Sequence, residues 1–141
     1  MKKEQKELLL KDLCTRLPYG VKCQVQEDEY TYIGTLCRIE VDNKNGNLLD
    51  FVETINGLDC QVYLTEVKPY LFPLSSMPEE EKNFLKWKLT TPKYDSFDEE
   101  TLEDLFNNNL QVVNYCYKNH IDVSGLIEKG LAIDATGLNI Y

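Results

Sequence analysis

The sequence predicts an α+β fold in which an N-terminal helix, a small strand-built unit and a helical C-terminal segment pack together. Apolar residues recur at helical spacing over the first part of the chain, alternate with polar residues over residues 18–74, and return to helical spacing from Ser76. A length of 141 residues suits one compact unit. We therefore divide the chain into residues 1–74, the N-terminal helix plus a β-barrel, and residues 75–141, the C-terminal helical segment.

The N-terminal helix is predicted by a stripe of leucines at helical spacing: Leu9, Leu10, Leu13 and Leu17. Lysines on the same stretch, including Lys3 and Lys6, fall where they can remain in water. Pro18 and Gly20 predict the end of the helix, because proline cannot continue it and glycine accepts the turn that follows.

Five short strands are expected over residues 18–74, at 20–26, 32–41, 48–55, 58–64 and 69–74. Asn45-Gly46 predicts a tight hairpin turn, since both residues accept positive φ. The sequence TEVKP (65–69) predicts a single helical turn before the last strand, which we interpret as a short edge strand because of its prolines. Together these features indicate a small antiparallel SH3-like barrel, with an OB-type barrel or an open sheet against helices as alternatives.

The alternation divides the side chains of these strands between two faces. Those expected to point inward are Val21, Cys23, Val25, Ile33, Cys37, Ile39, Val41, Leu58, Cys60, Val62 and Leu64. With Ile33 inward, Tyr30 and Tyr32 fall on the outer face, and Tyr63 does the same on its own strand. Outward aromatics can form a peptide groove or a base-stacking platform. They can also lie beneath flanking helices, and this is the interpretation that we favour.

The C-terminal half is predicted to hold helices near 76–89, 96–106 and 110–117. A short helix through Leu126 and Ile127 follows, with Asp122 or Ser124 as N-cap and Gly130 as its end. The last residues are too apolar for a free end, so we expect them to dock onto the rest of the protein.

The five cysteines are odd in number, widely spaced and never form CxxC or CxC. This pattern favours free, mostly buried thiols over a disulfide framework or a zinc site. The sequence also lacks an apolar run of the ~20 residues that a membrane span needs, and its start lacks a signal-peptide pattern. We expect a cytoplasmic protein with no membrane association, metal or cofactor.

The net charge of −9 is unevenly distributed. The first 26 residues carry more Lys and Arg than Asp and Glu, whereas the remainder is acidic. An acidic protein repels phosphate backbones, so nucleic-acid binding is disfavoured except at a local basic face of the first helix. The acidic run Asp95–Asp104 is interpreted as a solvated helix start, although cation binding or nucleic-acid mimicry are alternatives.

Two other patterns resemble known sites but are incomplete. The sequence DNKNGN (42–47) fails as a calcium loop, because aligning its glycine with the sixth position puts Val41 and Val52 where carboxylates are needed. Cys116 and His120 are spaced to share a helix face and Asp122 is near. A nucleophile also needs an activated thiolate and an oxyanion site, so we interpret Cys116 as buried and His120 as a surface or helix-terminal residue.

Three blocks, LLLKDLCTRLPYGVK, VKPYLFPLSSMPEEEK and NHIDVSGLIEKGLAIDATGLNIY, carry a resemblance to a family of short uncharacterised proteins from gut Bacteroidales. Members of this family look to be associated with prophage-like or mobile segments. The resemblance implies a cytoplasmic protein without an assigned activity, and it transfers no functional residue. The family commonly has DYRGLI where this chain has Val123 and Ser124 in place of the Tyr-Arg pair.

The leading functional hypothesis is a non-enzymatic interaction protein that contacts a partner protein, of unknown identity, through an acidic surface bearing Tyr30, Tyr32 and Tyr63. The alternative is a nucleic-acid accessory factor that uses these tyrosines with Lys3 and Lys6. A third hypothesis is an enzyme built on the Cys116–His120 pair. No residue of the sequence is assigned a catalytic or metal-binding role.

Overall fold

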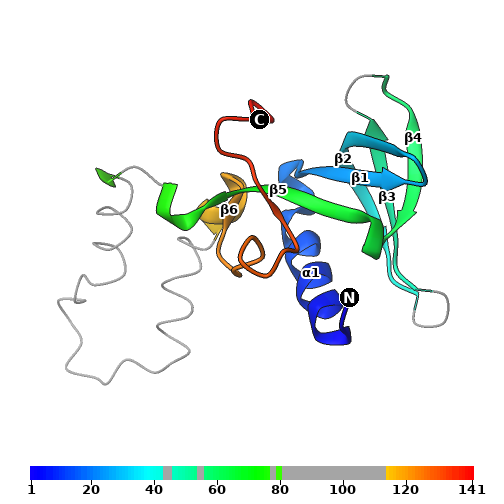
Figure 1. Ribbon diagram of the computed structural model, residues 1–141, viewed down its shortest axis with the longest axis horizontal. Helices are drawn as coiled ribbons and strands as arrows, with labels where there is room; N and C mark the ends of the chain where they lie inside the picture. The colour runs from blue at the N-terminus through cyan, green and yellow to red at the C-terminus, as the bar shows by residue number, and fades with distance from the viewer. Residues whose placement is uncertain (43–45, 54–55, 77–78, 81–113) are drawn as a thin grey trace.

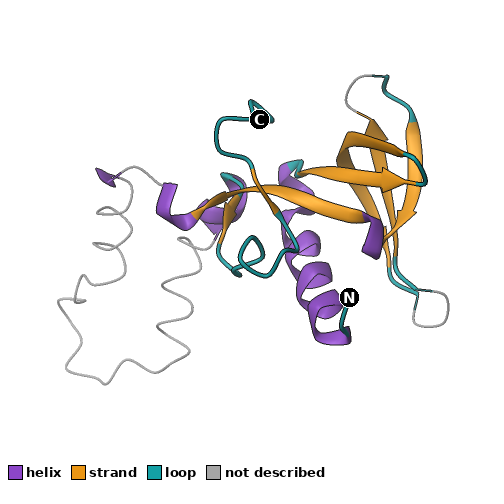
Figure 2. Ribbon diagram, viewed as in Figure 1, coloured by secondary structure: helices purple, strands orange, loops and turns teal. Residues whose placement is uncertain are grey.

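The structure is a computed structural model that describes residues 1–42, 46–53, 56–76, 79–80 and 114–141. Helix α1 spans Lys3–Arg16, and the strands are β1 (Lys22–Glu27), β2 (Tyr30–Glu40), β3 (Leu48–Glu53), β4 (Asp59–Tyr63), β5 (Val67–Pro73), β6 (Ile121–Asp122) and β7 (Ile133–Asp134). Single 3-10 turns are η1 (Leu17–Tyr19), η2 (Leu64–Glu66) and η3 (Leu74–Ser76) (Figures 1 and 2). Residues 114–118 are also helical. The predicted α+β class is confirmed.

The strands form one open sheet in the order β4-β3-β2-β1-β5-β6, and β7 also pairs with β5. The strands from β1 to β5 pair antiparallel, whereas β6 and β7 run parallel to β5. The expected closed SH3-like barrel over residues 18–74 is therefore not what the chain forms. Closure fails because β5 uses its outer edge for the C-terminal segment. In Figure 1, β5 reaches from the group β1–β4 on the right to β6 on the left.

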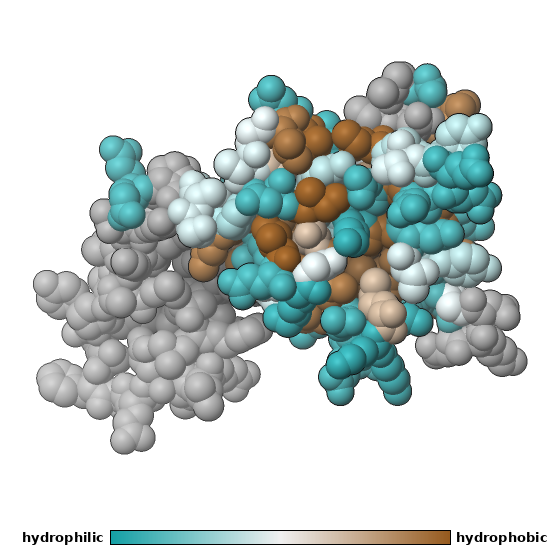
Figure 3. Space-filling view, in the orientation of Figure 1, coloured by the Kyte–Doolittle hydropathy of each residue, from teal (hydrophilic) through white to brown (hydrophobic). Residues whose placement is uncertain are grey.

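Helix α1 packs into the same hydrophobic core as the sheet and the C-terminal segment. Leu9 and Leu13 of the predicted leucine stripe are fully buried, as are Val21, Val25 and Leu126 of that core. The helix ends as expected. It passes through η1 to Gly20, whose φ of 66° is a left-handed conformation that glycine adopts without steric cost. Figure 3 shows hydrophobic side chains gathered over the middle of one face, where the C-terminal segment crosses β5 in Figure 1.

A β-bulge in β2 changes which side chains point inward. The register against β3 shifts between Leu36 and Arg38. Residues before the bulge therefore alternate in one phase and residues after it in the other. Leu36 is buried and Ile39 packs against the core, while Cys37 at the bulge is exposed. The expectation that Ile33 and Cys37 share the inward face with Ile39 was wrong, because it assumed an unbroken period.

Strand β5 lies inside the sheet, which corrects the prediction of an edge strand. Its prolines have no N–H to donate, yet the backbone between them keeps its hydrogen bonds. Phe72 N donates to His120 O at 2.8 Å, and Ala135 N donates to Leu71 O at 2.8 Å. The single helical turn expected before this strand is confirmed as η2.

The helix expected through Leu126 and Ile127 is replaced by hydrogen-bonded turns between β6 and β7. The docking of this end of the chain is confirmed, since Leu126, Leu131 and Ala135 are buried. The C-terminal helical segment is otherwise not confirmed. Most of the predicted helices near 76–89, 96–106 and 110–117, with the acidic run Asp95–Asp104, lie outside the described residues. No helix among the described residues is long and apolar enough to cross a membrane.

Candidate functional site

A groove lies between the N-terminal half of α1 and the loops that join β2 to β3 and β4 to β5. It consists of two cavities, of about 300 and 240 Å³, that share Lys6, Gly46 and Asn47. The larger cavity continues to Lys3, Glu7, Leu10, Val41 and Asp42. The smaller one continues to Tyr63, Leu64 and Thr65. We name this the lysine groove.

Helical spacing on α1 and a glycine in the loop after β2 position these side chains. On α1, Lys3, Lys6 and Leu10 follow helical spacing and so share one face. Gly46 has φ 94°, and a Cβ at that position would meet the Tyr63 ring at 3.7 Å. A side chain there would be strained by the positive φ, so the glycine lets the loop after β2 turn close to the tyrosine.

The charges lining the groove are mixed, and they differ in how far they are already neutralised. Lys3 Nζ lies 4.0 Å from Glu7 Oε1 in an exposed i,i+4 pair, and such a pair is weak. Asp42 also has an interaction partner. Lys6 is exposed and forms no ion pair within the described part of the chain. Its ammonium group is therefore available to a ligand at the junction of the two cavities.

The structure brings Lys3, Lys6 and Tyr63 of the predicted interaction residues to this groove, and it places the others elsewhere. Tyr30, at the hairpin of β1 and β2, is 77% exposed. Tyr32 pairs with Val25, packs against the core and donates its hydroxyl to Cys60 Sγ at 2.8 Å. Its expected outer position is wrong, because the phase of the strand was assigned from residues beyond the bulge.

Sequence reasoning missed the loop residues of the groove, among them Asn47 and Thr65. The only signal near them was the Asn45-Gly46 turn pattern, which was interpreted as a hairpin and not as part of a binding surface. Position 45 lies outside the described residues. The contact between the two loops, where Leu64 N donates to Asn47 O at 3.4 Å, joins segments that no local pattern relates.

Apart from the lysine groove, a cavity of about 490 Å³ lies over β2, β3 and β4. Its lining includes Cys37, Arg38, Asp50, Asp59 and Gln61. Its polar groups bind one another across the strands. Arg38 lies 3.9 Å from Asp50, and Gln61 donates to the same carboxylate at 2.9 Å. Asp59 is exposed and has no ion pair among the described residues, so this cavity presents a carboxylate where the lysine groove presents an ammonium and an exposed aromatic ring.

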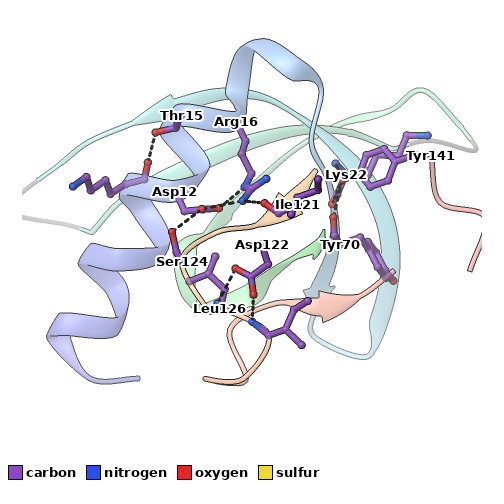
Figure 4. Close-up of polar contacts among 12 residues, drawn as sticks. Asp12, Thr15, Arg16, Lys22, Tyr70, Ile121, Asp122, Ser124, Leu126 and Tyr141 are labelled. Carbon is purple, nitrogen blue, oxygen red and sulfur yellow. Dashed lines mark hydrogen bonds and ion pairs between the residues drawn. The ribbon is translucent and has the colours of Figure 1, made fainter. Parts of the chain in front are cut away.

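A buried ion pair joins the other end of α1 to the C-terminal segment (Figure 4). Arg16 Nε donates to Asp12 Oδ2 at 2.6 Å, and Arg16 also donates to Ile121 O at 2.7 Å. Its guanidinium lies 4.6 Å from the centre of the Tyr117 ring. Ser124 Oγ donates to Asp12 at 3.3 Å. These contacts span two distant parts of the chain, so the pair has a structural role in docking.

His120 is held by the last residue of the sequence. Its ring stacks on Tyr141 with centroids 3.6 Å apart. The Tyr141 hydroxyl accepts from Lys22 N and donates to Tyr70 O, each at 2.9 Å. Burial, together with the positive charges of Arg16 and Lys22, lowers the pKa of His120 to about 4. The neutral form of the imidazole is therefore the one that fits this site.

The Cys116–His120–Asp122 pattern does not have the electrostatics of an activated thiol. Burial raises the pKa of Cys116, whereas an activated nucleophile needs a lowered value. Asp122 accepts backbone N–H bonds from Leu126 and Ile127, both at 2.9 Å, and so orients the turn that follows β6. All five cysteines are free; Cys23 and Cys116 are buried, whereas Cys14 and Cys37 are exposed, contrary to expectation.

Metal ligation is not suggested by the described residues, since no three of their His, Cys, Asp or Glu side chains cluster as a metal site would require. The lysine groove is thus the site whose free charge, exposed aromatic ring and concave shape coincide. Comparison of the chain with protein-family models, with curated proteins and with solved structures finds no match.

Proposed function

We propose that this chain is a non-enzymatic interaction protein that binds a partner protein through the lysine groove. The observation that carries the proposal is the position of Lys6, which has no ion pair among the described residues, lies where two cavities meet, and lines one of them with the half-exposed Tyr63. Tyrosine is among the residues that carry most of the binding energy at protein interfaces, and an ammonium in the same cavity can add a charged contact once water is excluded.

The division of the groove suggests how a polypeptide would bind in it. The groove consists of two adjoining cavities, of about 300 and 240 Å³, that meet at Lys6. Two adjoining shallow cavities suit successive side chains of one bound segment.

We further infer that β1 to β5 form an opened SH3-like unit. Three features support this: β1 pairs with both β2 and β5, β2 is long and bulged, and η2 directly precedes β5. By analogy of fold, such units often bind extended peptides in grooves lined by aromatic residues. The analogy agrees with a peptide ligand at Tyr63 and does not identify the ligand.

A nucleic-acid accessory role is the second candidate, and the proximity of Lys3 and Lys6 to Tyr63 favours it. A single strand could stack a base on the tyrosine and place a phosphate on a lysine. Glu7 and Asp42 line the same groove, however, and the chain as a whole carries −9. These negative charges repel a polyphosphate, so the protein partner is preferred.

Affinity capture from a native lysate tests the proposal when it is combined with matched variants. The wild type and the variants Lys6→Glu, Lys11→Glu, Tyr63→Ala and Tyr30→Ala are used as baits. Lys11 is exposed on α1, the helix that carries Lys3 and Lys6, and Tyr30 is exposed on β2. Neither residue lines the groove. We expect a partner that is lost with Lys6→Glu and Tyr63→Ala and kept with both controls. Equal recovery with all baits would exclude the groove as the binding site.

A further inference from the structure

We infer that the segment entering the lysine groove is an acidic, extended peptide that places a carboxylate on Lys6 Nζ and an apolar side chain on either side. This inference rests on the proposed function and names the class of partner. Two observations lead to it: the charge that is free at the centre of the groove, and the apolar surfaces that flank that charge.

The charge at the centre is positive. Lys3 is paired with Glu7 at 4.0 Å, and Asp42 already has a partner. Lys6 forms no ion pair among the described residues, and it is a charged side chain that lines both cavities. Asn47 and Thr65, which can donate hydrogen bonds through an amide and a hydroxyl, line the same cavity as Lys6. An ammonium with neutral donors beside it matches a carboxylate and disfavours a basic side chain.

The surfaces on either side of Lys6 are apolar. The larger cavity includes Leu10 and Val41, and the Val41 side chain is 59% exposed. The smaller cavity includes Tyr63, which is 51% exposed. Because the two cavities meet at Lys6, a bound segment that crosses both would contact an apolar surface before and after its carboxylate. Burial of these exposed groups would add affinity that is independent of charge.

The charge balance separates an acidic peptide from a nucleic acid. A single strand carries a phosphate at every nucleotide and gains affinity from several cations along its path. The groove has two lysines and two carboxylates among the described residues, and of these four charged residues Lys6 lines both cavities. One isolated carboxylate matches one ammonium, whereas successive phosphates would be placed against Glu7 or Asp42. The geometry therefore favours the peptide.

Fluorescence anisotropy with labelled peptides tests the inference on the full chain. The probe is a fluorescein-labelled, otherwise neutral hexapeptide with a single central glutamate between leucines, compared with peptides that have glutamine or lysine in place of that glutamate. We expect the glutamate peptide to bind about tenfold or more tightly than the glutamine peptide, since charge-assisted contacts are about twice as strong as neutral ones. Its affinity should fall as salt is raised. Equal binding of the glutamate and glutamine peptides would overturn the inference.

Variants then locate the binding. Lys6→Glu should abolish binding of the glutamate peptide, Lys6→Met should weaken it about tenfold, and the matched Lys11→Glu should leave it unchanged. An equal loss with Lys11→Glu would show general attraction to α1 and contradict the site. Circular dichroism establishes that each variant is folded, and Lys6→Met removes the charge without introducing repulsion.

Two further outcomes separate this inference from the proposed function. A partner captured from lysate in a Tyr63-dependent manner, but not displaced by excess glutamate peptide, would overturn the acidic class while leaving the groove as the binding site. Tighter binding of a labelled oligothymidylate than of the peptide, lost with Lys6→Glu, would replace the protein partner with a nucleic acid. If no captured protein depends on the groove, the proposed function itself fails.

Discussion

The two ends of helix α1 use the same kinds of charge for different purposes. Near its start, Lys6 is exposed beside the groove and has no ion pair among the described residues. Near its end, the side chains of Arg16 and Asp12 are 0% and 1% exposed and bind each other. A charge removed from water must be paired, so the buried end is committed to the fold. A charge left in water costs little to keep unpaired, so the exposed end can serve a ligand.

Breaking the buried pair of Arg16 and Asp12 should cause the largest loss in the free energy of unfolding. Arg16→Ala leaves Asp12 without its main partner and Ile121 O without its donor, and breaking one side of such a pair costs about 3–5 kcal/mol. Urea denaturation measures the free energy of unfolding. The matched variant Arg38→Ala, in an exposed pair, should cost less than about 1 kcal/mol. Similar costs for both arginines would contradict the difference between the two environments.

Shortening a buried side chain of the docked C-terminal segment should give the next largest loss of stability. Leu126 is fully buried in the core shared with α1, so Leu126→Ala should lower the free energy of unfolding by about 2–5 kcal/mol. Leu138 is 49% exposed on the same segment, and Leu138→Ala should change it by less than about 0.5 kcal/mol. The same chemical unfolding measurement distinguishes them. A small effect at Leu126 would mean that the segment docks without contributing to stability.

Acidification should weaken the contact between His120 and Tyr141. The folded state lowers the pKa of His120 from 6.5 to about 4, so the unfolded chain takes up the proton more readily. Stability due to this group is present above pH 6.5, falls as the pH drops toward 4, and is constant below that. Because the side chain is only partly buried, we expect a loss of about 1–2 kcal/mol after solvent screening. His120→Gln should remove this part of the pH dependence. If the free energy of unfolding changed with pH in the same way in both proteins, His120 would not be its source.

Substitution in the groove should have the smallest effect on folding. Lys6→Glu changes an exposed side chain, so the free energy of unfolding should change by no more than about 0.5 kcal/mol. Binding of the glutamate peptide should nevertheless be lost. Thermal or urea unfolding, measured beside the anisotropy titration, tests both parts. A large loss of stability would place Lys6 with the structural charges of α1 and not with the binding ones.

Much of the fold follows from local patterns. The leucine stripe predicts α1, and Pro18 and Gly20 predict where it ends, because both constraints act within a turn of the chain. Strict alternation predicts β1 and its buried Cys23. The same reasoning fails for β2. One extra residue near Cys37 reverses the alternation, and nothing in the hydrophobicity of the strand announces it.

The candidate site was predicted in its residue types and not in its arrangement. Lys3, Lys6 and Tyr63 were selected as exposed charges and an outward aromatic, which are local properties. Their meeting in one groove depends on how α1 lies against two loops that follow β2 and β4. Tyr30 and Tyr32 had the same local properties, but Tyr30 lies at the hairpin of β1 and β2, and the phase of β2 before its bulge packs Tyr32 against the core.

By itself, the sequence determined the N-terminal helix, the strands β1 to β5, the turns that join them and the surplus of positive charge near the N-terminus. These depend on backbone preferences and on side-chain spacing over a few residues. Only the tertiary structure decided that the sheet stays open, that Arg16 binds a carbonyl 105 residues away, and that Lys6 has no ion pair in the part of the chain that the structure describes. Contacts between distant segments depend on which surfaces remain to be buried after the local elements have formed.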